Sequence, residues 1–311
     1  LSSSFEAYAD KQIYSEIDNL NEFEHCNIDL KNLTKIDVNI NRKDKWNRNL
    51  IKASLSKNNG GKIINERYKK RYKSKLHFYT KNKIKCILKA KVRINGDWKD
   101  HIDLSEPNNY MVSLDVKITE GNFNGIRDFK LFIPSTKGGD KQIIYLNILK
   151  HLGFISPQSF KTNISINSRN DGVYNFVEKP SKELIEKNNL NEGPLLIVDE
   201  RSIWDEVWKN QRNNSSLYLF KVKNRNWSDK NIITQKITLD ALNILNSIYL
   251  NLHSYQLDYQ PFIGQKINTL NYNLDGKLNY DYSEVYKFDL ISTAFDARYA
   301  LIPNNRKFYF N

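Results

Sequence analysis

The stretch Ile84–Gly96, IKCILKAKVRING, sets the expected fold of the middle of this 311-residue chain. Towards its C-terminal end apolar and basic residues alternate, as in a strand that buries one face. The pair Asn95-Gly96 that follows is typical of a tight hairpin turn. We therefore expect a strand that reverses at this pair and continues in an antiparallel sheet.

Working outward, the same period of two recurs on both sides of this stretch. An Asp171-Gly172 pair predicts the hairpin turn between two of these runs, and Pro134 ends another. Together the runs predict strands at residues 35–55, 110–118, 129–133, 163–167, 173–178, 195–199 and 307–310.

Helical periodicity is concentrated in the C-terminal half, although a helix is also expected over residues 1–20. His151 and Gly153 form a typical C-terminal cap for one of these helices. Antiparallel strands followed by a more helical part predict an α+β protein, with a sheet-rich N-terminal lobe and a more helical C-terminal lobe. The helices are expected at residues 140–152, 181–188, 232–251 and 284–300.

The composition favours an anionic partner but does not identify it. Lys and Arg number 48 against 35 Asp and Glu, which gives a net charge of +13. Nucleic acid, phosphate, nucleotide and acidic polymer all fit such a charge. The basic residues are spread rather than striped, and no nucleic-acid-binding module is recognisable, so nucleic acid is not favoured. No run approaches 18 apolar residues, so no transmembrane segment is expected in this chain.

The two cysteines, Cys26 and Cys86, allow one disulfide without requiring it. No second Cys or His lies at zinc-ligand spacing from either one, so a structural zinc site is not expected. No signal peptide is visible, which leaves the compartment open.

Motifs of the common enzyme classes are absent from the sequence. It contains no G-x-x-x-x-G-K-[ST] phosphate loop, no G-x-G-x-x-G after a strand, no G-x-S-x-G and no H-E-x-x-H. The H-R-D and D-F-G sequences of ordinary protein kinases are missing as well.

A series of short charged motifs remains: RINGDWKDHI at 93–102, SLDVKI at 113–118, GIRDFKL at 125–131, DGVYNFVE at 171–178, and Asp296 followed by NNRKFYFN at 304–311. In this order and spacing they resemble the spore-coat protein H (CotH) kinase family, a group of atypical protein kinases. The resemblance covers roughly residues 85–200 and 284–311. It implies an N-terminal extension or accessory region over 1–80 and a kinase-like domain over 81–311, with a further acidic ligand expected beyond Asn311.

The resemblance implies an atypical protein-kinase-like fold that binds ATP and Mg²⁺ between two lobes. Its nucleotide-binding residues fall on Arg93, Gly96, Lys117 and Glu178. Its catalytic, metal-binding aspartate falls on Asp296, and a second metal ligand falls on Asn305.

These residue types suit phosphoryl transfer, in which a protein mainly positions groups and neutralises charge. A strand lysine such as Lys117 can hold phosphate oxygens, and Glu178 can orient it. Mg²⁺ prefers carboxylate, phosphate and water oxygens, which fits Asp296.

Simpler roles remain open for the same residues. Arg93 also fits an exposed ion pair on a hairpin with Asp97 and Asp100, and Lys117 fits a solvent-facing strand position. Glu178 suits a helix N-terminus, while His101 fits a structural histidine better than a catalytic base. A carboxylate at Asp296 on a helix is either paired in the core or functional.

The resulting expectation is an atypical kinase that transfers the ATP γ-phosphate to protein Ser/Thr or to an envelope glycan. The alternative is a non-catalytic cell-surface or assembly protein that binds acidic polymer. The partner is therefore a protein or surface-polymer substrate, and the resemblance favours the cell envelope or the outside of the cell.

Overall fold

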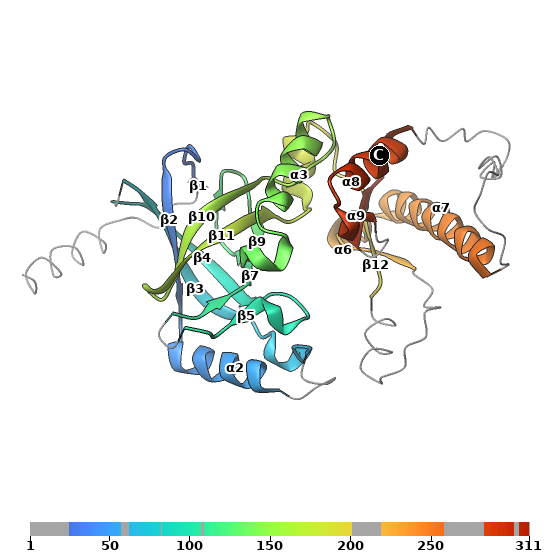
Figure 1. The fold of residues 1–311 in the computed structure, drawn as a ribbon. Helices are drawn as coiled ribbons and strands as arrows, with labels where there is room; N and C mark the ends of the chain where they lie inside the picture. The colour runs from blue at the N-terminus through green and yellow to red at the C-terminus, as the bar shows by residue number, and fades with distance from the viewer. Residues whose placement is uncertain are drawn as a thin grey trace, which may run out of the picture. The chain divides into compact units, whose positions relative to one another are not determined.

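The structure of this chain is a computed structural model, which describes residues 25–56, 62–81, 83–106, 109–200, 219–257, 283–301 and 305–310. The chain divides into two compact units, Leu1–Leu184 (unit 1) and Ile185–Asn311 (unit 2) (Figure 1). The helix expected over 1–20 lies outside the described residues.

Unit 1 is built around a closed barrel of seven strands, adjacent in the order β10-β11-β9-β7-β4-β3-β2. The parallel pairing of β2 with β10 closes the barrel, while the other neighbours are antiparallel. Closure leaves these strands no free edge. The strands are β2 (Leu33–Ile40), β3 (Tyr72–Thr80), β4 (Lys83–Ile94), β7 (Leu114–Ile118), β9 (Asp128–Phe132), β10 (Ser159–Ile166) and β11 (Arg169–Glu178).

The barrel shows that the expected fold class was wrong. A closed barrel is not the two-lobed, atypical protein-kinase-like α+β fold with a sheet-rich N-terminal and a helical C-terminal lobe. Strands β2 and β3, from the region expected to be accessory, belong to the same barrel as β4. Alternation along the chain predicts strands, but it does not encode their partners. The pairing of Ile36 with Ile164 that helps to close the barrel joins distant parts of the sequence.

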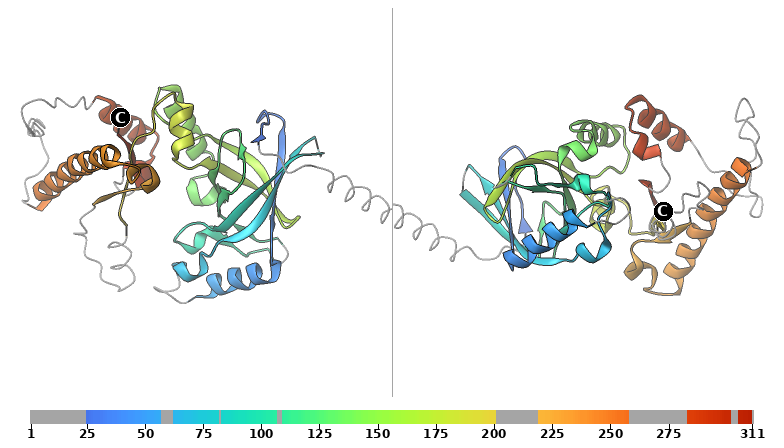
Figure 2. Two further views of the ribbon diagram at one scale, coloured as in Figure 1. Left: turned by 180° about the vertical axis from the view of Figure 1, so that it is seen from behind. Right: turned by 60° about the horizontal axis from the view of Figure 1, so that its bottom comes forward.

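Side chains at alternate strand positions fill the barrel interior. Val92, Val116 and Phe176 are fully buried there. Helix α2 (Lys43–Leu55) lies across one end of the barrel (Figure 2) and adds Trp46 to the same core. This segment was expected to continue a strand. The helical spacing of its buried residues, Trp46, Leu50 and Ala53, explains the helix instead.

Short elements connect and cover the barrel strands. Cys26 in β1 and Cys86 in β4 form a buried disulfide, the option that the sequence left open. These elements are β1 (His25–Cys26), η2 (Glu66–Tyr68), η3 (Lys99–His101), β5 (Ile102–Asp103), β6 (Met111–Val112), β8 (Asn122–Phe123), η4 (Pro134–Lys137) and α3 (Lys141–His151). Helix α4 (Lys182–Lys187) follows the last barrel strand, where the chain passes from unit 1 to unit 2.

Neither of the two expected tight hairpin turns forms at its predicted position. Asn95-Gly96 opens a longer loop, because β4 pairs with β7. The β10–β11 turn is formed by Asn167 and Ser168, both with positive φ, as a type I′ turn requires. Gly172 lies within β11, opposite Ile164.

Unit 2 contains a three-stranded antiparallel sheet in the order β13-β12-β14. Ala241 of α7 packs with the sheet residues Leu196, Val198 and Phe220 in its core. The helix expected over 284–300 is interrupted between α8 and α9, where Asp296 has a φ of 50°. The elements are β12 (Leu195–Val198), β13 (Phe220–Val222), α6 (Arg225–Ser228), α7 (Ile232–Leu257), α8 (Ser283–Ala294), α9 (Arg298–Leu301) and β14 (Lys307–Tyr309).

None of the helices in the described ranges has the length and apolar character needed to cross a membrane.

Candidate functional site

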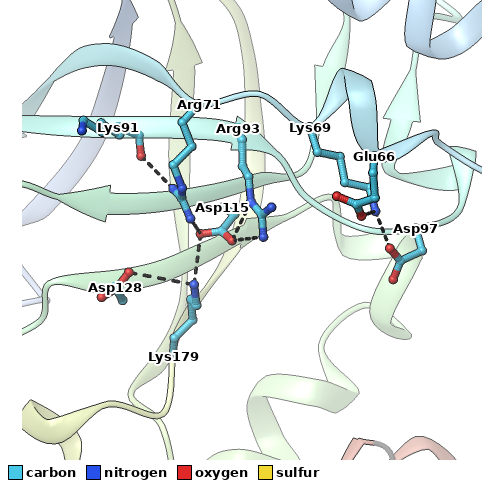
Figure 3. Close-up of polar contacts among 9 residues, drawn as sticks. All are labelled: Glu66, Lys69, Arg71, Lys91, Arg93, Asp97, Asp115, Asp128 and Lys179. Carbon is cyan, nitrogen blue, oxygen red and sulfur yellow. Dashed lines mark hydrogen bonds and ion pairs between the residues drawn. The ribbon is translucent and has the colours of Figure 1, made fainter. Parts of the chain in front are cut away.

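A buried carboxylate on the outer wall of the barrel gathers three cationic side chains. Asp115 lies on β7 between the core residues Leu114 and Val116, so its side chain points outward. Only 1% of Asp115 is exposed. Figure 3 shows Arg71, Arg93 and Lys179 converging on it.

The geometry around Asp115 uses both carboxylate oxygens. Arg93 donates from Nε and Nη2 to Oδ2 at 3.1 and 3.0 Å. Arg71 Nη2 and Lys179 Nζ both donate to Oδ1 at 3.2 Å. Lys179 Nζ also lies 3.9 Å from Asp128 Oδ1. Asp115 therefore holds three cations in defined positions.

Positive charge is in excess at this cluster. Burial raises the pKa of Asp115, but Lys179, Arg71 and Arg93 outweigh that effect and hold the pKa below its ordinary value. The carboxylate is therefore ionised at neutral pH. The Arg71, Arg93 and Lys179 side chains remain 31%, 36% and 20% exposed, so a dissolved anion can reach them.

Four separate chain segments build this cluster. Strand register places Arg93 opposite Asp115. Arg71 directly precedes β3, and Lys179 follows β11 with its backbone N–H donating to Asp128 O. Sequence reasoning identified Arg93 but missed Arg71, Asp115 and Lys179 as site residues. One available signal was a carboxylate between two apolar residues of an alternating strand.

Lys117 lies two residues beyond Asp115 on the same outer face. It is exposed and faces Lys91 on β4 and Asp128 on β9. Within the described part of the chain its ammonium group makes no hydrogen bond or ion pair. The structure therefore brings Arg93 and Lys117, two of the expected nucleotide-binding residues, to one wall.

Arg93 does not pair with the loop carboxylates that the simpler interpretation offered. Asp97 instead pairs with Lys69, whose buried ammonium also binds Glu66 Oε1 at 2.7 Å (Figure 3). The exposed-hairpin interpretation of Arg93 and Asp97 thus does not describe their contacts.

Position 96 requires a glycine, because the backbone there packs directly against the His101 ring. Its φ is +92°, and an added Cβ would lie 1.9 Å from the His101 ring. That ring is buried, with Nδ1 3.0 Å from Ser113 Oγ. Burial, which outweighs the opposite effect of Asp100, lowers the pKa of His101 to about 4, so this imidazole is neutral at physiological pH. These contacts account structurally for both residues.

Glu178 is separated from Lys117 by the barrel wall. It lies on the same side of β11 as the core residues Tyr174 and Phe176, and it is 1% exposed. Its Oε2 accepts a hydrogen bond from the Gln158 backbone N–H at 3.1 Å. No bond joins Glu178 to Lys117, so the structure does not form the expected orienting pair.

Asp296 and Asn305 belong to unit 2, and both are exposed. Asp296 lies in the turn after α8, and Asn305 precedes β14. Nearby, Arg306 Nη2 and Asp289 Oδ1 form an ion pair at 2.6 Å that sequence reasoning missed. No cluster of three or more His, Cys, Asp or Glu side chains suited to a metal ion occurs in the ranges described. One carboxylate and one amide oxygen fit Mg²⁺ only together with oxygens from a bound phosphate.

A second buried carboxylate, Asp37 on β2, lies beside a cavity of about 280 Å³. It accepts hydrogen bonds from Ser165 Oγ at 2.7 Å and Asn39 Nδ2 at 2.9 Å. Ser168 donates to it from its backbone N–H at 3.1 Å and from Oγ at 2.8 Å. All of these donors are neutral. They satisfy the carboxylate without a cationic partner, although Lys35 also lines the cavity.

No protein-family model matches the sequence, and no curated protein matches it. The resemblance to the CotH kinase family therefore rests on the motifs and their order.

Proposed function

We propose that this protein is an ATP-dependent phosphotransferase whose barrel wall binds the phosphate groups of the nucleotide. One observation carries the proposal: Arg93 and Lys117 flank a buried, ionised Asp115 that gathers more cations than it neutralises. Phosphoryl transfer depends on fixed positive groups of this kind.

The three residues have distinct roles in this proposal. Asp115 holds the Arg93 guanidinium through Nε and Nη2, which leaves Nη1 to donate to a phosphate oxygen. Lys117 supplies a mobile point charge beside it. Gly96 shapes the loop after β4 through its contact with His101, rather than by approaching the nucleotide.

The acceptor in this proposal is a hydroxyl group of protein Ser/Thr or of an envelope glycan, as the resemblance implies. The Cys26–Cys86 disulfide supports an exported or envelope protein, because such bonds persist in oxidising compartments. In unit 2, Asp296 is the catalytic carboxylate that the resemblance implies, and Asp296 and Asn305 carry oxygen atoms of the kind that bind Mg²⁺.

Calorimetric titration of the chain with ATP, with and without Mg²⁺, tests this function. Lys117→Ala should weaken ATP binding about tenfold, whereas Lys52→Ala, an exposed lysine of α2, should leave it unchanged. Asp296→Ala should remove the Mg²⁺ dependence and phosphoryl transfer. If the native chain does not bind ATP, or if Lys117→Ala binds it normally, the proposal is wrong.

A further inference from the structure

Strand register aligns lysines into rows on the outer wall of the barrel. Lys73 of β3 lies directly opposite Lys91 of β4, which in turn lies opposite Lys117 of β7. Lys75 and Lys89 form a second opposed pair. Directly opposed side chains on neighbouring strands have Cβ atoms about 5 Å apart, where like charges repel. We call these five residues the lysine face.

Part of this charge is balanced within the chain, because Lys117 lies opposite Asp128 on β9 and Lys75 takes part in an interaction of its own. Lys89 pairs with Glu120 at 2.9 Å. Lys73, Lys91 and Lys117 are exposed, and within the described ranges their ammonium groups have no hydrogen bond or ion pair. Outward barrel positions do not require lysine for folding, because neutral polar residues fill them equally well. The opposed rows therefore add repulsion that an anionic partner would relieve.

We propose that the lysine face is a docking surface for an extended acidic polysaccharide. Three adjacent strands spread the row Lys73–Lys91–Lys117 over about 10 Å, which suits a chain with regularly spaced carboxylates. The ammonium group is a point charge that tolerates varied acceptor geometry. This surface shares Lys117 with the proposed phosphate site, but polysaccharide binding on it does not require ATP.

One observation favours a glycan over a nucleic acid. The Cys26–Cys86 disulfide is typical of proteins in oxidising compartments, where surface polysaccharides are found.

The test is binding of the full chain to polygalacturonate at low and at physiological salt. A triple variant, Lys73→Gln/Lys75→Gln/Lys91→Gln, should lose about tenfold in affinity and show a weaker dependence on salt. The matched control, Lys31→Gln/Lys43→Gln/Lys52→Gln, removes the same charge from exposed positions elsewhere in unit 1 and should change affinity less than about twofold.

Lys117 is kept in the triple variant so that ATP binding reports separately on the proposed phosphate site. Normal ATP binding with weakened polygalacturonate binding supports a docking role for Lys73, Lys75 and Lys91 that is distinct from the phosphate role of Lys117. An equal loss in both triple variants, or no binding by the native chain, would overturn the docking proposal whatever ATP does. Tighter binding to a single-stranded oligonucleotide or to anionic lipid vesicles than to polygalacturonate would overturn the choice of a glycan.

Discussion

Asp115 and Asp37 are buried carboxylates on the outer face of one barrel, but they have opposite surroundings. Both lie between core-facing residues of a strand, and both are at most 2% exposed. Asp115 is held by Arg71, Arg93 and Lys179, whereas Asp37 is held by hydroxyl, amide and backbone N–H donors.

The difference distinguishes a carboxylate that stabilises the fold, Asp37, from one that positions cationic side chains at the surface, Asp115. Asp37 on β2 binds Ser165 of β10 and Ser168 of the β10–β11 turn, so it stabilises the parallel pair that closes the barrel. Neutral donors complete its hydrogen bonds and add no charge. Asp115 instead holds cations in excess of its own charge, which leaves positive charge at the surface for a ligand.

The largest effect is expected from Asp115→Ala. This change leaves three cations clustered without their carboxylate and should lower the free energy of unfolding by about 3 kcal/mol. That value is at the low end for a broken buried ion pair because the cations are partly exposed. Urea unfolding measures it, and Asp44→Asn, which changes an exposed carboxylate of α2, serves as a control. A loss below about 1 kcal/mol would show that the cluster contributes little to folding.

Asp37→Asn should have a somewhat smaller effect, about 2 kcal/mol. The substitution replaces one acceptor oxygen by an amide donor that faces the hydroxyl and amide donors of Ser168 and Asn39. Because these partners are neutral, added salt should change this loss less than it changes the loss in Asp115→Ala. Equal salt sensitivity of the two variants would contradict the comparison.

The pH dependence of stability distinguishes the Asp115 cluster further. Since the pKa of Asp115 is lowered from 3.8 on folding, its stabilisation is fully present above that value. It is lost as the pH falls through the lower folded-state pKa. The difference in unfolding free energy between the native chain and Asp115→Asn should therefore be constant near neutral pH and shrink below about pH 4. A difference that instead grows on acidification would exclude this assignment.

The smallest effect is expected from Lys91→Gln. Removing the central lysine of an opposed row relieves repulsion from Lys73 and Lys117 and should raise the unfolding free energy by about 0.5 kcal/mol without ligand. Thermal unfolding at low salt provides the measurement, and high salt should abolish the gain. A loss of stability would mean that Lys91 makes a favourable contact. The lysines on this outer wall would then not repel one another as described.

Local pattern predicted most elements but few of their partners. Alternation located β4, β7 and β9, and helical periodicity located α3 and α7. The local pattern did not predict α2, because the helical spacing of Trp46, Leu50 and Ala53 matters only once these side chains pack into the end of the barrel. The Asp171-Gly172 turn failed because bonds from Ser165 and Ser168 to Asp37 favour a turn at Asn167-Ser168 instead.

The residues of the candidate site likewise fall into those that the sequence predicted and those that only the structure revealed. Arg93 and Lys117 were expected at one site from the family resemblance, and the structure brings them to one wall. Arg71 and Lys179 carry no local signal, because their importance comes from Asp115, which register and burial place between them. Glu178 was expected beside Lys117 but lies on the other side of the wall, since strand parity decides which face a side chain reaches.

The sequence alone determined that this chain forms a globular, strand-rich and strongly basic protein, because those properties follow from composition and from short-range periodicity. Tertiary structure decided the barrel closure through β2 and β10, the Cys26–Cys86 bond and the alignment of the lysines. Basic residues that are spread along the sequence become rows on the folded chain. Antiparallel register juxtaposes residues from different strands, and no periodicity within a single strand encodes that register.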